Sequence, residues 1–379
     1  MQQVAEPWLI LNLTGSSVLL GLDSFAADAS VWLLTLIGGV IADRRDRKLV
    51  IYLFQGIQMF CPAIVVLLLL TGHVSAWLII LLSFVVGATD ALSTPALQSI
   101  VPSTVEASQI ESAVALNSTQ FNLSRVLGPM AGGLVMAGIG AVGCFALNTL
   151  TYIPLFLAIA VLPKTLRVLK TPKVAHLRGP SIRGRFSKMI SSRNLRSAML
   201  TVVISSLFCN PLLTFAPVLI RDVFRSNAVG FGQALSAFGG GGLLAAFLVF
   251  LTKDKIDRRL FCSLAAAANG LLLIAVAFNS WFWLLIPLLI GAGCAMTACQ
   301  ITASTILQSH VGNDVRGQVT SVYIMLMRGG SAIGSMVVGL ATSRWGILHV
   351  LLVCGLAAIS FQALNFAAWR NQSGEKQIN

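Results

Sequence analysis

Apolar stretches of about 20 residues recur along the chain, and they constrain its fold more than any other feature. They include residues 49–70, 76–101, 141–162 and 345–369. A helix of that length crosses a hydrocarbon core about 30 Å thick, because each residue advances it by about 1.5 Å. Only 10% of the residues are charged, whereas about a quarter are charged in soluble domains. The sequence therefore predicts an all-α, polytopic membrane protein.

The apolar pattern predicts one partial helix, ending near residue 13, and eleven complete spans after it. The complete spans are expected at 17–41, 49–71, 76–101, 108–137 and 141–162, and then at 195–220, 229–252, 260–279, 281–308, 316–342 and 345–369. This division predicts an N-terminal helix bundle at 1–162, a basic linker at 163–194, a C-terminal helix bundle at 195–369 and a tail at 370–379.

Basic residues are distributed unevenly between the two sides of the membrane in this scheme. Of the 26 Lys and Arg residues, 21 fall on the side that carries the linker and the tail. Only Arg221, Arg225 and Arg344 fall on the other side, and two more lie inside spans. Because basic loops favour the cytoplasm, the linker and the C-terminus are predicted to be cytoplasmic. The net charge of +13 reflects this topology and not a nucleic-acid partner.

Two motifs repeat at nearly the same offset. Residues 43–49 (DRRDRKL) match 254–260 (DKIDRRL) at an offset of 211, and 97–101 (LQSIV) match 307–311 (LQSHV) at 210. Both copies lie on the predicted cytoplasmic side, so the repeat is parallel and relates two six-helix halves. In this register residues 195–211 of the second half would match positions before Met1, so about 17 residues of the first helix are missing from this sequence. We therefore expect the natural chain to carry further residues before Met1.

Residues 39–48 (GVIADRRDRK) resemble the signature loop of the major facilitator superfamily, Gly-x-x-x-Asp-Arg-x-Gly-Arg-Arg/Lys. Asp46 replaces the glycine of the basic half, as in the branch that resembles the enterobactin exporter and related bacterial multidrug and secretion exporters. Residues 2–15 also resemble the end of that branch's first helix. The resemblance implies the major facilitator fold and a secondary transporter of the bacterial inner membrane.

The resemblance also implies a conformational latch that holds the two halves in one access state. Its residues here are Gly39, Asp43, Arg44, Arg47 and Lys48. Gly39 is expected to allow close helix approach, Asp43 to accept hydrogen bonds, and the bases to anchor the turn at the headgroups. The alternative is an ordinary cytoplasmic turn, which explains the bases but not the spaced Gly and Asp.

A second element, Gly-Pro-x-x-Gly-Gly, resembles the antiporter motif of the fifth span. Pro129 removes a backbone donor and bends a helix, while Gly128, Gly132 and Gly133 allow bending and tight packing. Small residues are also common at any membrane helix interface, which is the alternative. One departure is notable. Many proton-linked drug antiporters carry an arginine four residues before a glycine of the fourth span, and Ser83 stands there in this chain.

Ionisable side chains inside spans are few, and each costs at least about 2.5 kcal/mol to bury in a membrane. They are expected to line a proton and substrate cavity, with two polar neighbours, and the full set is Glu6, Asp28, Asp90, Arg125, Arg328, Asn117 and Gln300. The polar pair can equally join helices. A static ion pair of Asp90 with Arg125 is the alternative for those two residues.

Glu6 is the first candidate for proton exchange. It is the only acid of the first helix and adjoins Pro7, where the helix is expected to kink. Asp90 and Asp28 follow as candidates. Asp23 is expected at the outer rim, in water, so that Asp23→Asn is expected to have little effect.

These patterns favour proton-coupled export of a drug-like or siderophore-like molecule by alternating access. The alternatives are a facilitator or symporter, a lysophospholipid flippase, and a transport-inactive scaffold or sensor. Seven scattered cysteines and four isolated histidines form no metal, cofactor or nucleophile motif, so an enzyme is not expected. The expected partners are the cargo, protons and the lipid bilayer, with no nucleic acid, and the chain is expected to act as a monomer.

The latch generates the first testable prediction. Asp43→Asn keeps the size of the side chain and removes its charge, so membrane insertion is expected to be normal while transport falls sharply. Expression in the membrane fraction and uptake into vesicles measure the two effects. Unchanged transport at equal expression would count against the latch.

Overall fold

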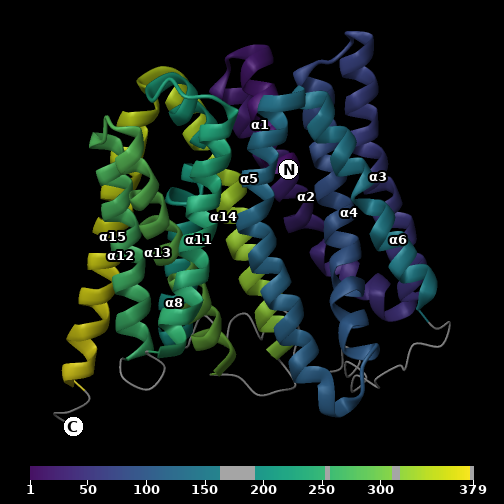
Figure 1. The fold of residues 1–379 in the computed structure, drawn as a ribbon. Coiled ribbons are helices and arrows are strands. Elements are labelled where there is room, and N and C mark those ends of the chain that lie inside the picture. The colour runs from purple at the N-terminus through teal and green to yellow at the C-terminus, as the bar shows by residue number, and fades with distance from the viewer. Residues whose placement is uncertain (163–192, 252–256, 310–315, 376–379) are drawn as a thin grey trace. The chain divides into compact units, whose positions relative to one another are not determined.

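The computed structural model describes residues 1–162, 193–251, 257–309 and 316–375, and these residues form helices joined by short turns (Figure 1). The predicted linker lies outside the described residues. The elements are α1 (Gln2–Thr14), α2 (Ser17–Arg44), α3 (Arg47–Thr71), α4 (Ala76–Ser103), η1 (Ala107–Gln109), α5 (Ile110–Leu150), α6 (Tyr152–Val161), α8 (Arg193–Phe208), α9 (Pro211–Thr214), α10 (Ala216–Val218), η2 (Leu219–Val223), α11 (Ala228–Leu251), α12 (Arg258–Phe278), α13 (Phe282–Ser309), α14 (Arg316–Trp345) and α15 (Ile347–Glu375).

Within the described ranges, ten segments are long and apolar enough to cross a membrane. One of them, 115–161, has 47 residues, about twice the length that a bilayer requires. It is interrupted at Gly140, whose φ of 70° and ψ of −169° are not helical. The chain reverses direction there, as a contact between the two segments shows: the Cys144 thiol donates to the carbonyl of Gly132 at 3.4 Å. The predicted boundary between the fifth and sixth spans is confirmed.

The span predicted at 195–220 is confirmed over Leu195–Thr214, but its helix is interrupted. α8 ends at Phe208, and α9, α10 and η2 follow as short separate turns. Pro211 and Pro217 explain the break, because each lacks the N–H group that an α-helix needs at that position. Asn210 donates to the Ser331 hydroxyl, and the Thr214 and Ser335 hydroxyls lie 3.3 Å apart. Side chains of α14 thus bond to the polar residues at the break.

The repeated loop motif begins a helix in the same way in both copies. The Asp46 carboxylate accepts from the backbone N–H of Lys48 at 2.8 Å, at the start of α3. The Asp257 carboxylate accepts from the N–H of Arg259 at 2.8 Å, at the start of α12. Each aspartate is an N-cap in extended conformation, so glycine is not required there. This explains why an aspartate can replace the glycine of the signature loop.

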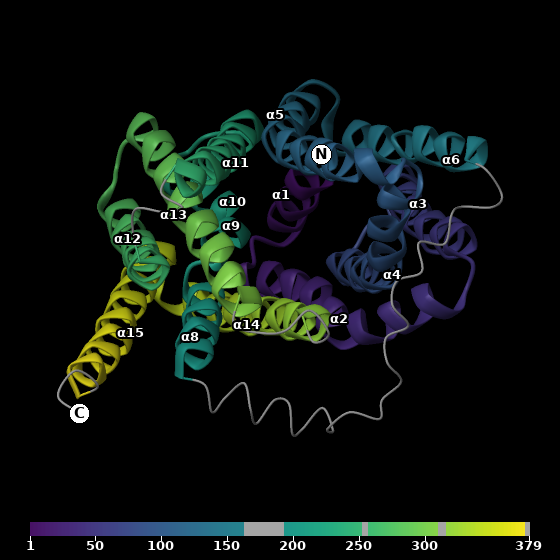
Figure 2. The ribbon, with the colours of Figure 1, turned by 90° about the horizontal axis from the view of Figure 1, so that it is seen from below.

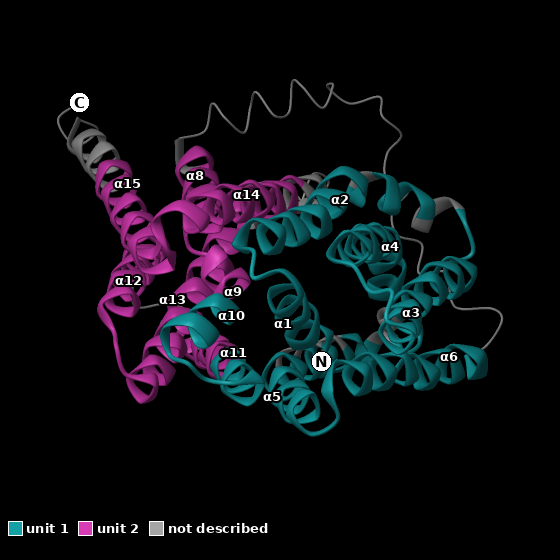
Figure 3. Ribbon diagram, turned by 90° about the horizontal axis from the view of Figure 1, so that it is seen from above, with its two compact units in different colours: residues 1–174, 216–236 teal, residues 175–215, 237–379 magenta. Residues whose placement is uncertain are grey.

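Contacts divide the chain into two compact units, coloured separately in Figure 3. The first contains Met1–Val174 and Ala216–Ser236, and the second contains Ala175–Phe215 and Ala237–Asn379. The segment 216–236 thus belongs with the first unit, whereas the sequence assigned it to the C-terminal bundle. Within the first unit, α1 packs against α2, α4, α5 and α10 (Figure 2).

Glycines bring the helices of the first unit into backbone contact. A Cβ added at Gly38 would lie 2.2 Å from the carbonyl oxygen of Ala91, and one added at Gly87 would lie 2.4 Å from that of Ala27. Both contacts join α2 to α4. A Cβ at Gly39 would meet nothing within 4 Å. The close helix approach expected at Gly39 is therefore made by its neighbour Gly38, because Gly38 and not Gly39 faces α4.

The predicted bending element packs α5 between two helices. A Cβ at Gly132 would lie 3.0 Å from Met1 Cα, next to α1, and one at Gly133 would lie 2.8 Å from Ala228 O in α11. α5 continues as a helix through Pro129, and its non-helical residue is Gly140. The glycines thus serve tight packing, and bending at Pro129 during transport stays a prediction.

This packing generates a matched pair of variants. Gly133→Ala is expected to destabilise the chain by about 1 to 3 kcal/mol, because its methyl group would meet backbone atoms that cannot move aside. Gly138→Ala in the same helix has open space around it, and it is expected to be neutral or stabilising by up to about 1 kcal/mol. Thermal unfolding in detergent measures both changes. Equal melting temperatures would contradict the packing role of Gly133.

Candidate functional site

Three helices bring two acids and a hydroxyl together in the first unit. The Ser83 hydroxyl of α4 is hydrogen-bonded to Glu6 of α1, and it lies 2.5 Å from Oδ1 of Asp23 in α2. Ser83 and Asp23 are buried, at 4% and 6% exposure, whereas Glu6 is partly exposed. Two carboxyl groups on one buried hydroxyl form the candidate site.

The Glu6 side chain is oriented by a second set of polar groups. The Gln2 amide, one turn earlier in α1, donates to Glu6 Oε2 at 2.8 Å. The Asn148 amide, in the part of α5 that follows Gly140, donates to Gln2 Oε1 at 2.8 Å. Both carboxyl oxygens of Glu6 therefore have polar partners, and the row of side chains extends from Asn148 to Asp23.

The position of Asp23 corrects the expectation that it lies at the outer rim in water. Gly87 follows Ser83 by one helical turn, and Ser30 follows Asp23 by two. Ser30 is fully buried where α4 presents Gly87, and its Oγ lies 2.3 Å from the place of a Gly87 Cβ. The missing side chain at Gly87 lets α2 approach α4, and this approach places the Asp23 carboxyl on Ser83.

A sequence signal for this contact does exist. Asp23, Ser30 and Gly38 recur on α2 at spacings of seven and eight, which keeps them on one helix face. Ser83, Gly87 and Ala91 recur on α4 at spacings of four. If these two rows of small and polar residues are assumed to pack against each other, the sequence predicts that Asp23 faces Ser83.

The other predicted cavity residues are not part of this cluster. Asp90, two turns after Ser83, accepts from the Thr94 hydroxyl at 3.1 Å. The side chains of Asn117 and Arg125 are exposed on α5, and Asp28 is partly exposed on α2. In the second unit, Arg328 and Gln300 are partly exposed, and the Gln300 carbonyl accepts from the Tyr323 hydroxyl at 3.2 Å.

The basic end of the predicted latch contacts neighbouring helix ends. The Arg47 guanidinium donates to the carbonyl of Ser99 at 3.4 Å, and the Lys48 ammonium donates to that of Leu162. These are the last turn of α4 and the residue after α6. The side chains of Asp43 and Arg44 lie outside the described residues.

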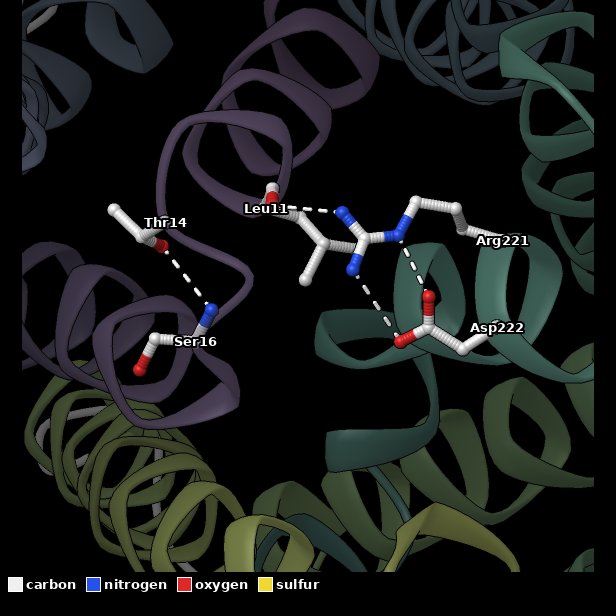
Figure 4. Close-up of polar contacts among 5 residues, drawn as sticks. All are labelled: Leu11, Thr14, Ser16, Arg221 and Asp222. Atoms are coloured by element: carbon white, nitrogen blue, oxygen red, sulfur yellow. Dashed lines mark hydrogen bonds and ion pairs between the residues drawn. The ribbon is translucent and has the colours of Figure 1, made fainter.

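A further polar contact holds the end of α1, and sequence reasoning did not identify it. Arg221 of η2 donates to the carbonyl of Leu11 at 2.7 Å, and its guanidinium also pairs with Asp222 at 2.7 Å (Figure 4). The Leu11 carbonyl accepts a second bond, from the N–H of Gly15. Ser16 N–H donates to the Thr14 hydroxyl beside it. A C-terminal carbonyl of the helix that carries Glu6 is thus bound to η2.

Among the described residues, no group of three or more His, Cys, Asp and Glu side chains is arranged to hold a metal ion. At the Glu6 cluster, two carboxyl groups, one hydroxyl and two amides are placed for hydrogen bonding and proton exchange.

Comparisons with known proteins agree with this architecture. The chain is 25% identical over 361 residues to the staphyloferrin A transporter of Staphylococcus aureus, covering 94% of this chain and 89% of that one. It is 25% identical over 383 residues to the multidrug efflux pump Tap of Mycobacterium tuberculosis, covering 95% and 89%. The crystal structure of the nucleoside transporter NupG superposes with a TM-score of 0.76 at 11% identity, covering 97% and 94%.

The model of the transmembrane secretion effector family matches residues 1–377. The relatives named above are transporters and not enzymes. The match spans nearly the whole chain, and the helical architecture is that of major facilitator transporters. This chain therefore belongs to the transmembrane secretion effector family of the major facilitator superfamily, and it is a multi-pass membrane transporter.

Proposed function

We propose that the chain exports a small amphipathic organic molecule in exchange for protons, by alternating access. One observation carries the coupling: Glu6, which is partly exposed, shares a hydroxyl with the buried Asp23. Acids inside a membrane span normally mark substrate or proton pathways, because an isolated charge there is costly. A carboxyl that keeps some access while bonded to a buried partner can take up and release a proton.

The position of Glu6 on α1 can link proton exchange to movement of that helix. Glu6 lies in the middle of α1, and the Leu11 carbonyl near the end of the same helix is bound by Arg221. In the predicted topology Arg221 is on the outer side, while Arg47 and Lys48 are on the cytoplasmic side. Arg221 and α1 belong to the same compact unit, so this contact joins Glu6's helix to η2 within that unit. A change in the protonation of Glu6 can then favour one position of α1 over another.

The relatives support the cargo class and the direction. One is a transporter of the siderophore staphyloferrin A, and the other is a multidrug efflux pump. Both descriptions fit a small organic cargo, which we place in a cavity that contains Glu6. We further propose that the protein acts as a monomer in the bacterial inner membrane, with its C-terminus in the cytoplasm.

Dye transport tests this function. Everted membrane vesicles that contain the full chain are expected to accumulate ethidium when the lumen is acidified, and a protonophore is expected to abolish the accumulation. Uptake that only equilibrates ethidium across the membrane and is unaffected by the protonophore would contradict proton coupling and favour a facilitator. No uptake of ethidium beyond that of empty vesicles would contradict a dye-like cargo and favour a flippase or a scaffold.

The carboxyl pair generates the next prediction. Glu6→Gln cannot exchange a proton, so gradient-driven accumulation is expected to be lost while ethidium binding persists. Asp23→Asn is now expected to impair accumulation as well, because Asp23 shares Ser83 with Glu6. Binding is measured by ethidium fluorescence polarisation, and accumulation by vesicle uptake.

Glu106→Gln is the matched control for both variants. Glu106 is exposed and makes no side-chain capping bond at the start of η1, so removing its charge is expected to leave accumulation unchanged. Full accumulation by Glu6→Gln would make Glu6 a structural partner, and the proton site would have to be sought at Asp90 or Asp28.

A further inference from the structure

Ser83 has more hydrogen-bonding partners than its single proton can serve. Its oxygen contacts Glu6 Oε1, Asp23 Oδ1 and, at 3.0 Å, the backbone carbonyl of Ile79. A hydroxyl donates one proton and accepts through two lone pairs. The Ile79 carbonyl has no proton to give. At least one of the two carboxyl groups must therefore be protonated and must donate to Ser83.

The geometry does not decide which of the two acids carries the proton. If Ser83 donates to Glu6, then Asp23 carries the proton, and if Ser83 donates to Asp23, then Glu6 carries it. Donation to the Ile79 carbonyl, the most distant of the three partners, would instead require a proton on each acid. The two arrangements differ by the rotation of one hydroxyl and the transfer of one proton between two carboxyl groups bound to that hydroxyl. Two acids that interact this closely bind protons as a pair and not as separate sites.

The surroundings keep Ser83 at the point where the two acids meet. Ser83 is 4% exposed, and the Gly87 contact one turn later fixes the distance between α2 and α4. Gln2 donates to the outer oxygen of Glu6, which leaves the other oxygen for Ser83. The buried Cys61 thiol of α3 donates to the carbonyl of Ile57 at 3.4 Å.

We propose that Ser83 is a positioning residue that joins Glu6 and Asp23 into one unit holding one shared proton. An arginine at this position would supply a fixed positive charge and allow both acids to ionise. The small neutral hydroxyl instead requires a proton between them, so the unit as a whole gives up and regains that proton. This inference deepens the proposed function and rests on it for its role in transport.

Infrared spectroscopy of the full chain in lipid vesicles tests the shared proton without a cargo. The C=O stretch of a protonated carboxyl is separate from that of a carboxylate, and isotopic labelling of the carboxyl carbon shifts it. At neutral pH the wild type is expected to show this band for one protonated carboxyl per chain. Labelling glutamate and labelling aspartate are each expected to shift part of it, and Glu6→Gln and Asp23→Asn are each expected to alter it.

Ser83→Ala tests the positioning role. It is expected to move the band, because the hydroxyl bond is lost, and to confine the isotope response to one residue type. Thr89→Val is the matched control, since this buried α4 hydroxyl bonds only to Val85 and Val86 of its own helix. It is expected to leave the band unchanged.

Two results would overturn the inference: a band that responds to neither acid or to only one in the wild type, and an unchanged isotope response in Ser83→Ala. If Ser83→Ala does not fold, the labelling of the wild type still decides whether the proton is shared. A shared proton without ethidium transport would reject the proposed function alone, whereas coupled transport without a shared proton would reject this inference alone.

Discussion

The hydrocarbon solvent imposes the constraint on which this structure depends. Lipid offers no hydrogen bonds, so every polar group inside a span must find its partner within the protein. Backbone groups satisfy this demand by forming helices. The acids Glu6 and Asp23 satisfy it on the Ser83 hydroxyl, at a point where three helices meet. A polar cluster in such a place restricts how α1, α2 and α4 can pack, and it also makes their packing responsive to protonation.

Glycines make this meeting point possible. Gly38 and Gly87 bring α2 onto α4, and Gly132 and Gly133 let α5 contact α1 and the first turns of α11. Close backbone contact replaces the hydrophobic driving force, which is weak between helices in lipid. At the end of α1, Arg221 binds the Leu11 carbonyl. The helix that carries Glu6 is therefore held by packing along its length and by a polar contact at its end.

The sequence predicted most of the helices, because length and apolarity alone decide which segments span a membrane. It also predicted the boundary near Gly140, whereas the choice of Glu6 as the first proton site stays a prediction. It predicted the span that begins at residue 195 but not the interruption of its helix near Pro211 and Pro217. It also failed at Asp23, because the depth of a residue along a helix does not tell which neighbour it faces. The Ser83 contact depends on residues 60 and 77 positions apart, so it required the fold.

Glu6 and Asp23 are proposed to carry protons during transport, and a measurement of proton flow coupled to ethidium movement tests this most directly. Sealed vesicles that contain the purified chain and an internal pH-sensitive dye can be given an ethidium gradient with no initial pH gradient. Ethidium movement is expected to drive protons in the opposite direction, and Glu6→Gln is expected to abolish this proton flow. Ethidium movement without proton flow, or an equal proton flow in Glu6→Gln, would contradict the claim.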